Sequence, residues 1–143
     1  MKNSGNKAQI SQTQFSRSGR QNYAKQKRKN FSSSKVGELF EYGIDLENRL
    51  LYIGTQHFDS DGDDLGVDSL RAEYVIKGLH FLNYTGDKPI KAVLFTPGGS
   101  VTEGWAIYDA IRASAAPVDI EVLGEAMSTG AIILQAGRER IYS

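Results

Sequence analysis

The 143-residue sequence contains no cysteine, and this absence excludes two kinds of small protein. A disulfide scaffold and a metal site built from thiolates both require cysteine side chains. The sequence also lacks a hydrophobic signal core and any apolar run of about eighteen residues, the length that a membrane-spanning helix needs. We therefore expect a single domain without membrane insertion, and the composition is compatible with a cytoplasmic protein.

Acidic residues are absent from the first 35 residues, although the formal net charge of the whole chain is zero. This segment holds nine of the 17 lysine and arginine residues, so residues 36–143 carry eight basic against 17 acidic side chains. The segment is rich in Ser, Gln, Asn and Lys, and it cannot bury enough apolar surface to offset the entropy of ordering. We predict a disordered basic tail over residues 1–35.

The basic run at residues 25–29 lies between two aromatic residues, Tyr23 and Phe31. Such a run can contact nucleic acid or an acidic protein surface. A solvated extension is the preferred interpretation, and we assign no nucleic-acid partner to the tail.

Beyond the tail, the apolar residues alternate between the spacing of strands and the spacing of helices. This alternation predicts an α/β fold of βα units around a mainly parallel sheet, with a functional site at the carboxyl ends of the strands. The predicted elements are a segment of undecided type at 36–42, strands at 49–54, 90–95 and 118–123, helices at 68–84, 101–113 and 128–135, and a last strand from residue 140.

One apolar run ends at Pro97, Gly98 and Gly99. Glycines adopt positive φ angles and allow a second chain or a reacting carbonyl to approach the backbone closely. Ser100 followed by Glu103 matches a capping box, so a helix should begin immediately after the glycines. The glycine pair therefore lies at a strand–helix turn, and an ordinary tight turn without a ligand remains the alternative.

A second strand–helix turn places Ser128 between the small residues Ala126 and Gly130. This pattern is typical of a nucleophilic serine, because small neighbours permit a sharp turn that displays the hydroxyl group. The free N–H groups and the dipole of the following helix would favour an oxyanion beside the serine. An ordinary helix-capping serine is the alternative interpretation.

Residues 45–143 resemble the N-terminal half of the proteolytic subunit of the Clp protease, a serine peptidase. The stretches that carry the resemblance are 49–54, 96–104 with 106–109, and 124–131 with Gly137. The resemblance implies repeated β-β-α or βα units, a fold shared with crotonases. It also implies that residues 36–143 form the N-terminal part of a peptidase domain that is incomplete at its C-terminus.

By position, the resemblance implies that Ser128 is the nucleophile and that the backbone amides of Gly99 and Thr129 form the oxyanion hole. Gly98 would lie against the bound substrate. The family usually has methionine where this chain has Thr129, which would alter the floor of the pocket. The resemblance implies no cofactor and no metal. It implies unfolded polypeptide substrates, an AAA+ unfoldase partner and stacked heptameric rings.

The family takes its general base from a histidine about two dozen residues after the serine, and its aspartate from further on. This sequence extends only fifteen residues beyond Ser128. The resemblance places neither His57 nor His80 as the base, and His80 lies in a helical pattern typical of a surface or core histidine. We therefore expect either a fragment or one part of a split subunit that a C-terminal polypeptide completes. In both cases we expect the isolated chain to have little or no peptidase activity.

Two further hypotheses follow from the same residues. A non-catalytic ring subunit or regulator would assemble with complete peptidase subunits. A crotonase-like acyl-CoA enzyme would bind a thioester oxygen with two backbone amides, but it needs no serine nucleophile, so Ser128 argues against it.

The acidic run at residues 59–64 superficially suggests a calcium loop. Counted from Asp59, loop positions six and twelve hold Asp64 and Leu70, where an EF-hand requires Gly and Glu. We predict a solvated loop there that also caps the following helix.

Overall fold

The computed structural model describes residues 33–54, 60–62 and 66–143, and the structural statements below refer to these residues. Most of the predicted basic tail lies outside them. Residues 33–35, however, form the start of a helix, so regular structure begins before the predicted boundary at residue 36. No helix in the described part of the chain has the length and apolar character needed to cross a bilayer.

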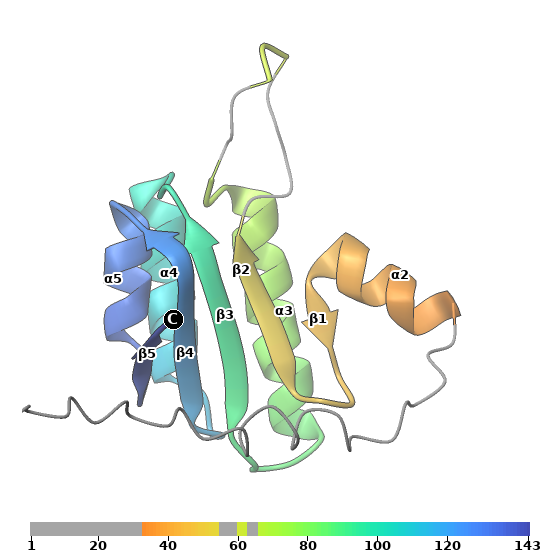
Figure 1. Cartoon of the computed structure of the whole chain (residues 1–143). Helices are drawn as coiled ribbons and strands as arrows, with labels where there is room; N and C mark the ends of the chain where they lie inside the picture. The colour runs from red at the N-terminus through yellow and green to blue at the C-terminus, as the bar shows by residue number, and fades with distance from the viewer. Residues whose placement is uncertain (1–32, 55–59, 63–65) are drawn as a thin grey trace, which may run out of the picture. The chain divides into compact units, whose positions relative to one another are not determined.

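The predicted α/β fold is confirmed, and the predicted elements occur in the expected order, with one short strand at Ile44–Asp45 that was not predicted (Figure 1). The segment of undecided type at 36–42 is helical, and the strand predicted at 118–123 continues for three more residues. The elements are α2 (Ser33–Tyr42), β1 (Ile44–Asp45), β2 (Leu50–Gly54), α3 (Ser69–Tyr84), β3 (Ile90–Thr96), α4 (Val101–Arg112), β4 (Val118–Ala126), α5 (Thr129–Gln135) and β5 (Arg140–Tyr142).

The five strands form one sheet in the order β1-β2-β3-β4-β5. The short strand β1 is antiparallel to β2, whereas all other neighbours are parallel. Figure 1 shows α3, α4 and α5 on the same face of the sheet. Because parallel strands end at a common edge, the turns that follow β3 and β4 lie side by side at that edge.

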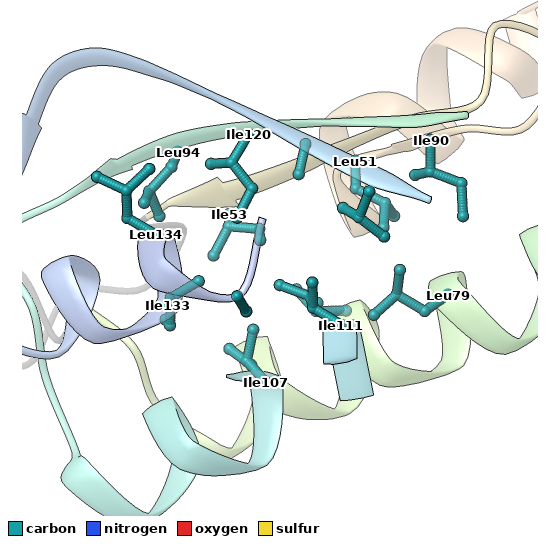
Figure 2. Close-up of a cluster of buried hydrophobic side chains, with 14 of the residues drawn as sticks. Leu51, Ile53, Leu79, Ile90, Leu94, Ile107, Ile111, Ile120, Ile133 and Leu134 are labelled. Carbon is teal, nitrogen blue, oxygen red and sulfur yellow. The ribbon is translucent and has the colours of Figure 1, made fainter. Parts of the chain in front are cut away.

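The hydrophobic core fills the space between this face of the sheet and the three helices. Figure 2 shows strand residues such as Ile53, Leu94 and Ile120 facing helix residues such as Ile107 and Ile133. All five side chains have 1 % exposure or less. Each contributes about 1.5–3 kcal/mol through burial of its apolar surface. The core therefore fixes the strand ends and helix starts from which the candidate site projects.

Strand β4 contains an irregularity just before the candidate site. Leu94 of β3 pairs with Val122, but Thr96, only two residues further along β3, pairs with Ala126. Two extra residues of β4 are therefore accommodated as a bulge, where Gly124 has a φ angle of 77°. The bulge sets Ala126 opposite the last residue of β3, and this position fixes where Ser128 emerges.

The side chain of Arg49 closes the C-terminal end of α3. Its guanidinium donates hydrogen bonds to the carbonyl oxygens of Leu82 at 2.9 Å, Gly86 at 3.0 Å and Lys88 at 3.0 Å. The last carbonyl groups of a helix have no partner within the helix, so these bonds replace water at the end of α3. Arg49 itself has a φ angle of 54°, which is uncommon for a residue other than glycine.

We expect the Arg49→Ala variant to lower the free energy of unfolding by about 2 kcal/mol, because several charge-assisted hydrogen bonds are lost together. Urea denaturation monitored by circular dichroism measures this change. Lys77→Ala serves as the control, since Lys77 forms an exposed pair with Glu73 one turn away in α3. Its expected cost is at most about 0.5 kcal/mol. Equal costs for the two variants would contradict the role given to Arg49.

Candidate active site

Ser128 joins β4 to α5 in an unusual backbone conformation, with a φ angle of 51° and a ψ angle of −121°. L-amino acids other than glycine rarely adopt this region, which costs of the order of 1–3 kcal/mol. The residue occupies the N-cap position of α5, yet its side chain forms no capping hydrogen bond. Ser128 is also exposed. The hydroxyl group of Ser128 therefore does not cap α5, as the hydroxyl of an N-cap serine ordinarily does.

Backbone hydrogen bonds fix the turn around Ser128 to the neighbouring strand. Met127 N–H donates to the carbonyl oxygen of Thr96 at 3.0 Å, which ties the turn to the end of β3. Gly130 N–H donates to Met127 O at 2.8 Å and starts the helix. A Cβ atom on Gly130 would lie 2.6 Å from Cγ2 of Thr96. Gly130 is therefore needed because α5 approaches β3 closely, whereas the positive φ angle of the turn belongs to Ser128.

The glycine loop after β3 lies directly against Ser128. A Cβ atom at Gly98 would be 2.5 Å from Ser128 Cβ and 3.1 Å from Ser128 Oγ. Gly98 N–H donates to Thr96 Oγ1 at 3.1 Å, and this hydroxyl donates to Gly98 O at the same distance. Gly98 has a φ angle of 113°. The structure thus brings together Gly98 and Ser128, which are thirty positions apart in the sequence.

Val67, just before α3, holds the other side of the glycine loop. Val67 N–H donates to Gly98 O at 2.6 Å, and Ser100 N–H donates to Val67 O at 2.8 Å. These two bonds form an isolated parallel bridge between Val67 and Gly99. Gly99 N–H takes no part in the bridge. Within the described ranges, neither Gly99 N–H nor Thr129 N–H donates a hydrogen bond to another part of the chain, so both remain available to a ligand.

The predicted capping box at the start of α4 does not form in its standard geometry. Ser100 is the N-cap residue of α4, but its side chain makes no hydrogen bond to the helix backbone. Its hydroxyl instead donates to the carboxylate of Glu103. A serine–carboxylate bond satisfies both side chains and leaves the first N–H groups of the helix without a side-chain partner. The start of the helix was predicted correctly, whereas its capping bonds were not.

Thr129, one residue after Ser128, is buried with an exposure of 1 %. Its hydroxyl Oγ1 has no hydrogen-bond partner in the structure. The side chain packs against α4, where a Cβ atom on Gly104 would lie 2.9 Å from Thr129 Cβ. A glycine at position 104 therefore lets α4 approach the first turn of α5. The side chain of Thr129 is therefore part of the contact between α4 and α5.

The structure places no histidine of its described part beside Ser128. His80 is exposed on α3, as expected for a surface histidine, and it lies eleven residues after Ser69, the first residue of the helix. At 1.5 Å per residue this separation is about 16–17 Å along the helix axis. His57 lies outside the described residues.

The acidic run at 59–64 is described only at residues 60–62. Among the residues with defined positions, no group of three or more His, Cys, Asp or Glu side chains could hold a metal ion. The helix cap predicted from this loop is supplied instead by Asp68, whose carboxylate accepts a hydrogen bond from Arg71 N–H at 2.7 Å.

A serine on a strained strand–helix turn, next to free backbone amides of an α/β sheet, is the arrangement typical of serine hydrolases. Comparison with known families gives a more specific result: the Clp protease family model matches residues 65–141. The chain belongs to the Clp protease family.

Relatives of known name and structure agree with this assignment. The chain is 37 % identical over 108 residues to ATP-dependent Clp protease proteolytic subunit 1 of Protochlamydia amoebophila, covering 75 % of this chain and 47 % of the relative. ClpP1 from Listeria monocytogenes, solved as the native protein and as a point mutant, is 25 % identical with a TM-score of 0.56, covering 64 % of this chain and 48 % of that protein. The chain spans about half the length of these relatives.

Proposed function

We propose that this chain supplies the nucleophile and the oxyanion hole of a Clp-type serine endopeptidase. Ser128 Oγ would attack the carbonyl carbon of a peptide bond and form a tetrahedral adduct. Gly99 N–H and Thr129 N–H would donate hydrogen bonds to the oxyanion, and Gly98 would lie against the substrate. The observation that carries the proposal is the strained, exposed conformation of Ser128 beside the glycine loop.

The two amides come from different loops, and each loop is held by bonds that do not involve a substrate. The Gly99 loop is fixed by Val67, and the Thr129 turn is fixed by Thr96. Donors that are already in place need no reorganisation when negative charge develops on the carbonyl oxygen. Losing one such donor typically costs about 100-fold to 1000-fold in kcat.

The general base must come from residues other than those described, because a serine hydroxyl is a weak nucleophile without one. We propose that a histidine and an aspartate outside this stretch complete the site, in the same polypeptide or in a complementing C-terminal one. The loss of a triad histidine costs about a millionfold in kcat. The isolated 143-residue polypeptide is therefore expected to have very little peptidase activity.

We further propose that the chain acts within the cytoplasm in a homo-oligomeric ring, as resemblance to the family implies. An AAA+ unfoldase would deliver unfolded polypeptides to that ring. A non-catalytic ring subunit would assemble in the same way, but it has no need for a strained serine. A crotonase-like acyl-CoA enzyme needs no serine nucleophile, so that hypothesis does not explain the strained conformation of Ser128.

We expect a fluorophosphonate probe to label Ser128 only when a polypeptide that carries the missing histidine and aspartate is co-produced with the chain. The base raises the nucleophilicity of the hydroxyl group, and the probe reports it without a peptide substrate. In-gel fluorescence followed by mass spectrometry of the labelled peptide measures the outcome. Ser128→Ala should remove the label completely.

Ser100→Ala is the matched control for this experiment, since Ser100 is also an exposed N-cap serine at the end of a neighbouring strand. Its backbone is ordinary, with a φ angle of −62° and a ψ angle of 131°. Labelling should persist in this variant. If Ser128 stays unlabelled in every combination, the catalytic proposal is wrong and a non-catalytic subunit is favoured.

A further inference from the structure

Thr96, the last residue of β3, lies between the two loops of the candidate active site and is fully buried, with an exposure of 0 %. Its backbone carbonyl oxygen accepts the hydrogen bond from Met127 N–H, and its Cγ2 methyl group packs against Gly130. Its hydroxyl group bonds to the other loop, at Gly98. One residue therefore contacts both the glycine loop and the turn that carries Ser128.

The Thr96 hydroxyl forms two hydrogen bonds to the same residue. Gly98 N–H donates to Thr96 Oγ1, and Thr96 Oγ1 donates to Gly98 O, each at 3.1 Å. Both residues are buried, so water does not readily replace these bonds. Gly98 has a φ angle of 113°, and a glycine without these bonds would have many other backbone conformations available. The hydroxyl therefore restrains the most flexible type of residue at the point where the loop enters the site.

The position of the Gly98 carbonyl group determines where the next N–H group points. Gly98 O accepts hydrogen bonds from the Thr96 hydroxyl and from Val67 N–H, the latter at 2.6 Å. In a planar trans peptide, the C=O of one residue and the N–H of the next point in opposite directions. Gly99 N–H must therefore point away from Thr96 and Val67. This direction agrees with the lack of any bond from Gly99 N–H to the part of the chain that the structure describes.

Rotation of the peptide group between Gly98 and Gly99 would remove this donor from the site. The rotated group would present a carbonyl oxygen where the N–H now lies, and a carbonyl oxygen repels an oxyanion instead of stabilising it. Glycine on both sides of the peptide group leaves little steric resistance to such a rotation. The bonds from Thr96 and Val67 to Gly98 O are therefore what holds the group in one orientation.

We propose that Thr96 is a positioning residue, whose hydroxyl group fixes the peptide between Gly98 and Gly99 so that Gly99 N–H faces the site. This inference rests on the proposed function, because it assigns the orientation of one oxyanion-hole donor to a residue that does not touch the substrate. The backbone of Thr96 also holds Met127, so the same residue fixes the glycine loop relative to the turn at Ser128. Displacing a catalytic group by about 1 Å costs of the order of 100-fold in rate.

The direction of the Gly99 N–H bond can be measured in the full chain without any reaction, from residual dipolar couplings of the ¹⁵N-labelled protein. Thr96→Val replaces the hydroxyl with a methyl group of similar size that cannot bond to Gly98. We expect the Gly99 coupling to change in this variant, while the couplings of the strands stay as in the native chain. Thr96→Ser keeps the hydroxyl, so its Gly99 coupling should match the native value. An unchanged Gly99 coupling in Thr96→Val would overturn the proposal.

Fluorophosphonate labelling of the complemented protein measures the consequence for reactivity. In Thr96→Val the maximal labelling rate constant should fall at least about tenfold, while the probe concentration for half-maximal rate stays unchanged, because the donor acts on the developing charge. Thr96→Ser should react at close to the native rate. Thr85→Val is the matched control: it removes a hydroxyl that donates to Leu82 O at 2.9 Å, at the C-terminal end of α3, and should leave the rate unchanged.

The two measurements separate this inference from the catalytic proposal. If the native complemented protein is not labelled at all, the catalytic proposal is wrong, and the Gly99 coupling still decides whether Thr96 fixes the amide. If the native protein is labelled and Thr96→Val reacts equally fast, the catalytic proposal stands and the role of Thr96 is overturned. Should Thr96→Val fail to fold, Thr96→Ser decides: slow labelling or a changed Gly99 coupling would show that the methyl group matters instead of the hydroxyl.

Discussion

Replacing Gly99 with alanine is expected to lower the free energy of unfolding by about 4 kcal/mol and to remove the reactivity of Ser128. Two costs combine at this position. Gly99 has a φ angle of 144°, which a residue with a Cβ atom rarely adopts. A Cβ atom would also lie 2.4 Å from Val67 N and 2.5 Å from Val67 O. Because both contacts are to backbone atoms, the bridge between Val67 and the glycine loop has to break.

Urea denaturation measures the stability of the Gly99→Ala variant, and fluorophosphonate labelling of the complemented protein measures its reactivity. Gly37→Ala is the matched control, because a Cβ atom at Gly37 meets nothing within 4 Å and the residue lies inside α2. The same chemical change there should stabilise the protein by about 0.5–1 kcal/mol. A cost below about 1 kcal/mol for Gly99→Ala would show that the loop is free to move away from Val67.

The regular elements were predictable because their apolar spacing follows from the way each element faces the core. In β4, Val118, Ile120 and Val122 alternate with polar residues, and the structure buries these three. The bulge further along β4 was not predictable. A bulge depends on how the residues of two neighbouring strands are paired. The sequence of one strand does not show which residues of the other strand lie opposite it.

Helix α3 shows a second limit of apolar spacing. Leu70 and Ile76 are apolar residues of this helix, yet the structure buries Arg71 and Val75 and leaves Leu70 and Ile76 partly exposed. Apolar spacing treats every charge as exposed, so it cannot find the buried guanidinium of Arg71. The pairing of Val67 with the glycine loop was missed for a different reason, since Val67 lies outside any regular element and pairs over a long distance in sequence.

The approach of Gly98 to Ser128 was predictable, because both residues follow parallel strands that end at one edge of the sheet. Sequence alone could not show that Ser128 carries the strained backbone of its turn. The pattern of small residues at 126 and 130 suggested that these neighbours would supply the freedom to turn. The structure assigns Gly130 to close packing on Thr96 instead, and the unfavourable φ angle falls on the serine.

This strain leads to the second large expected effect: Ser128→Gly should make the protein more stable while removing all labelling by the fluorophosphonate probe. Glycine adopts a φ angle of 51° with a ψ angle of −121° without a Cβ penalty, so the variant recovers much of the 1–3 kcal/mol held in the turn. No side-chain capping bond is lost, because Ser128 makes none. The greater freedom of glycine in the unfolded chain offsets part of this gain, leaving a net stabilisation of about 1 kcal/mol.

Ser128→Ala separates strain from the loss of the hydroxyl group. Alanine keeps the Cβ atom, so its free energy of unfolding should stay within about 0.5 kcal/mol of the native value while labelling is still lost. Thermal and urea denaturation of the two variants beside the native chain give the comparison. A stabilising Ser128→Gly with a neutral Ser128→Ala means that the fold holds this serine in an unfavourable conformation, as a displayed nucleophile requires. If Ser128→Gly is instead the less stable of the two, the turn is not strained, and the observation on which the catalytic proposal depends is lost.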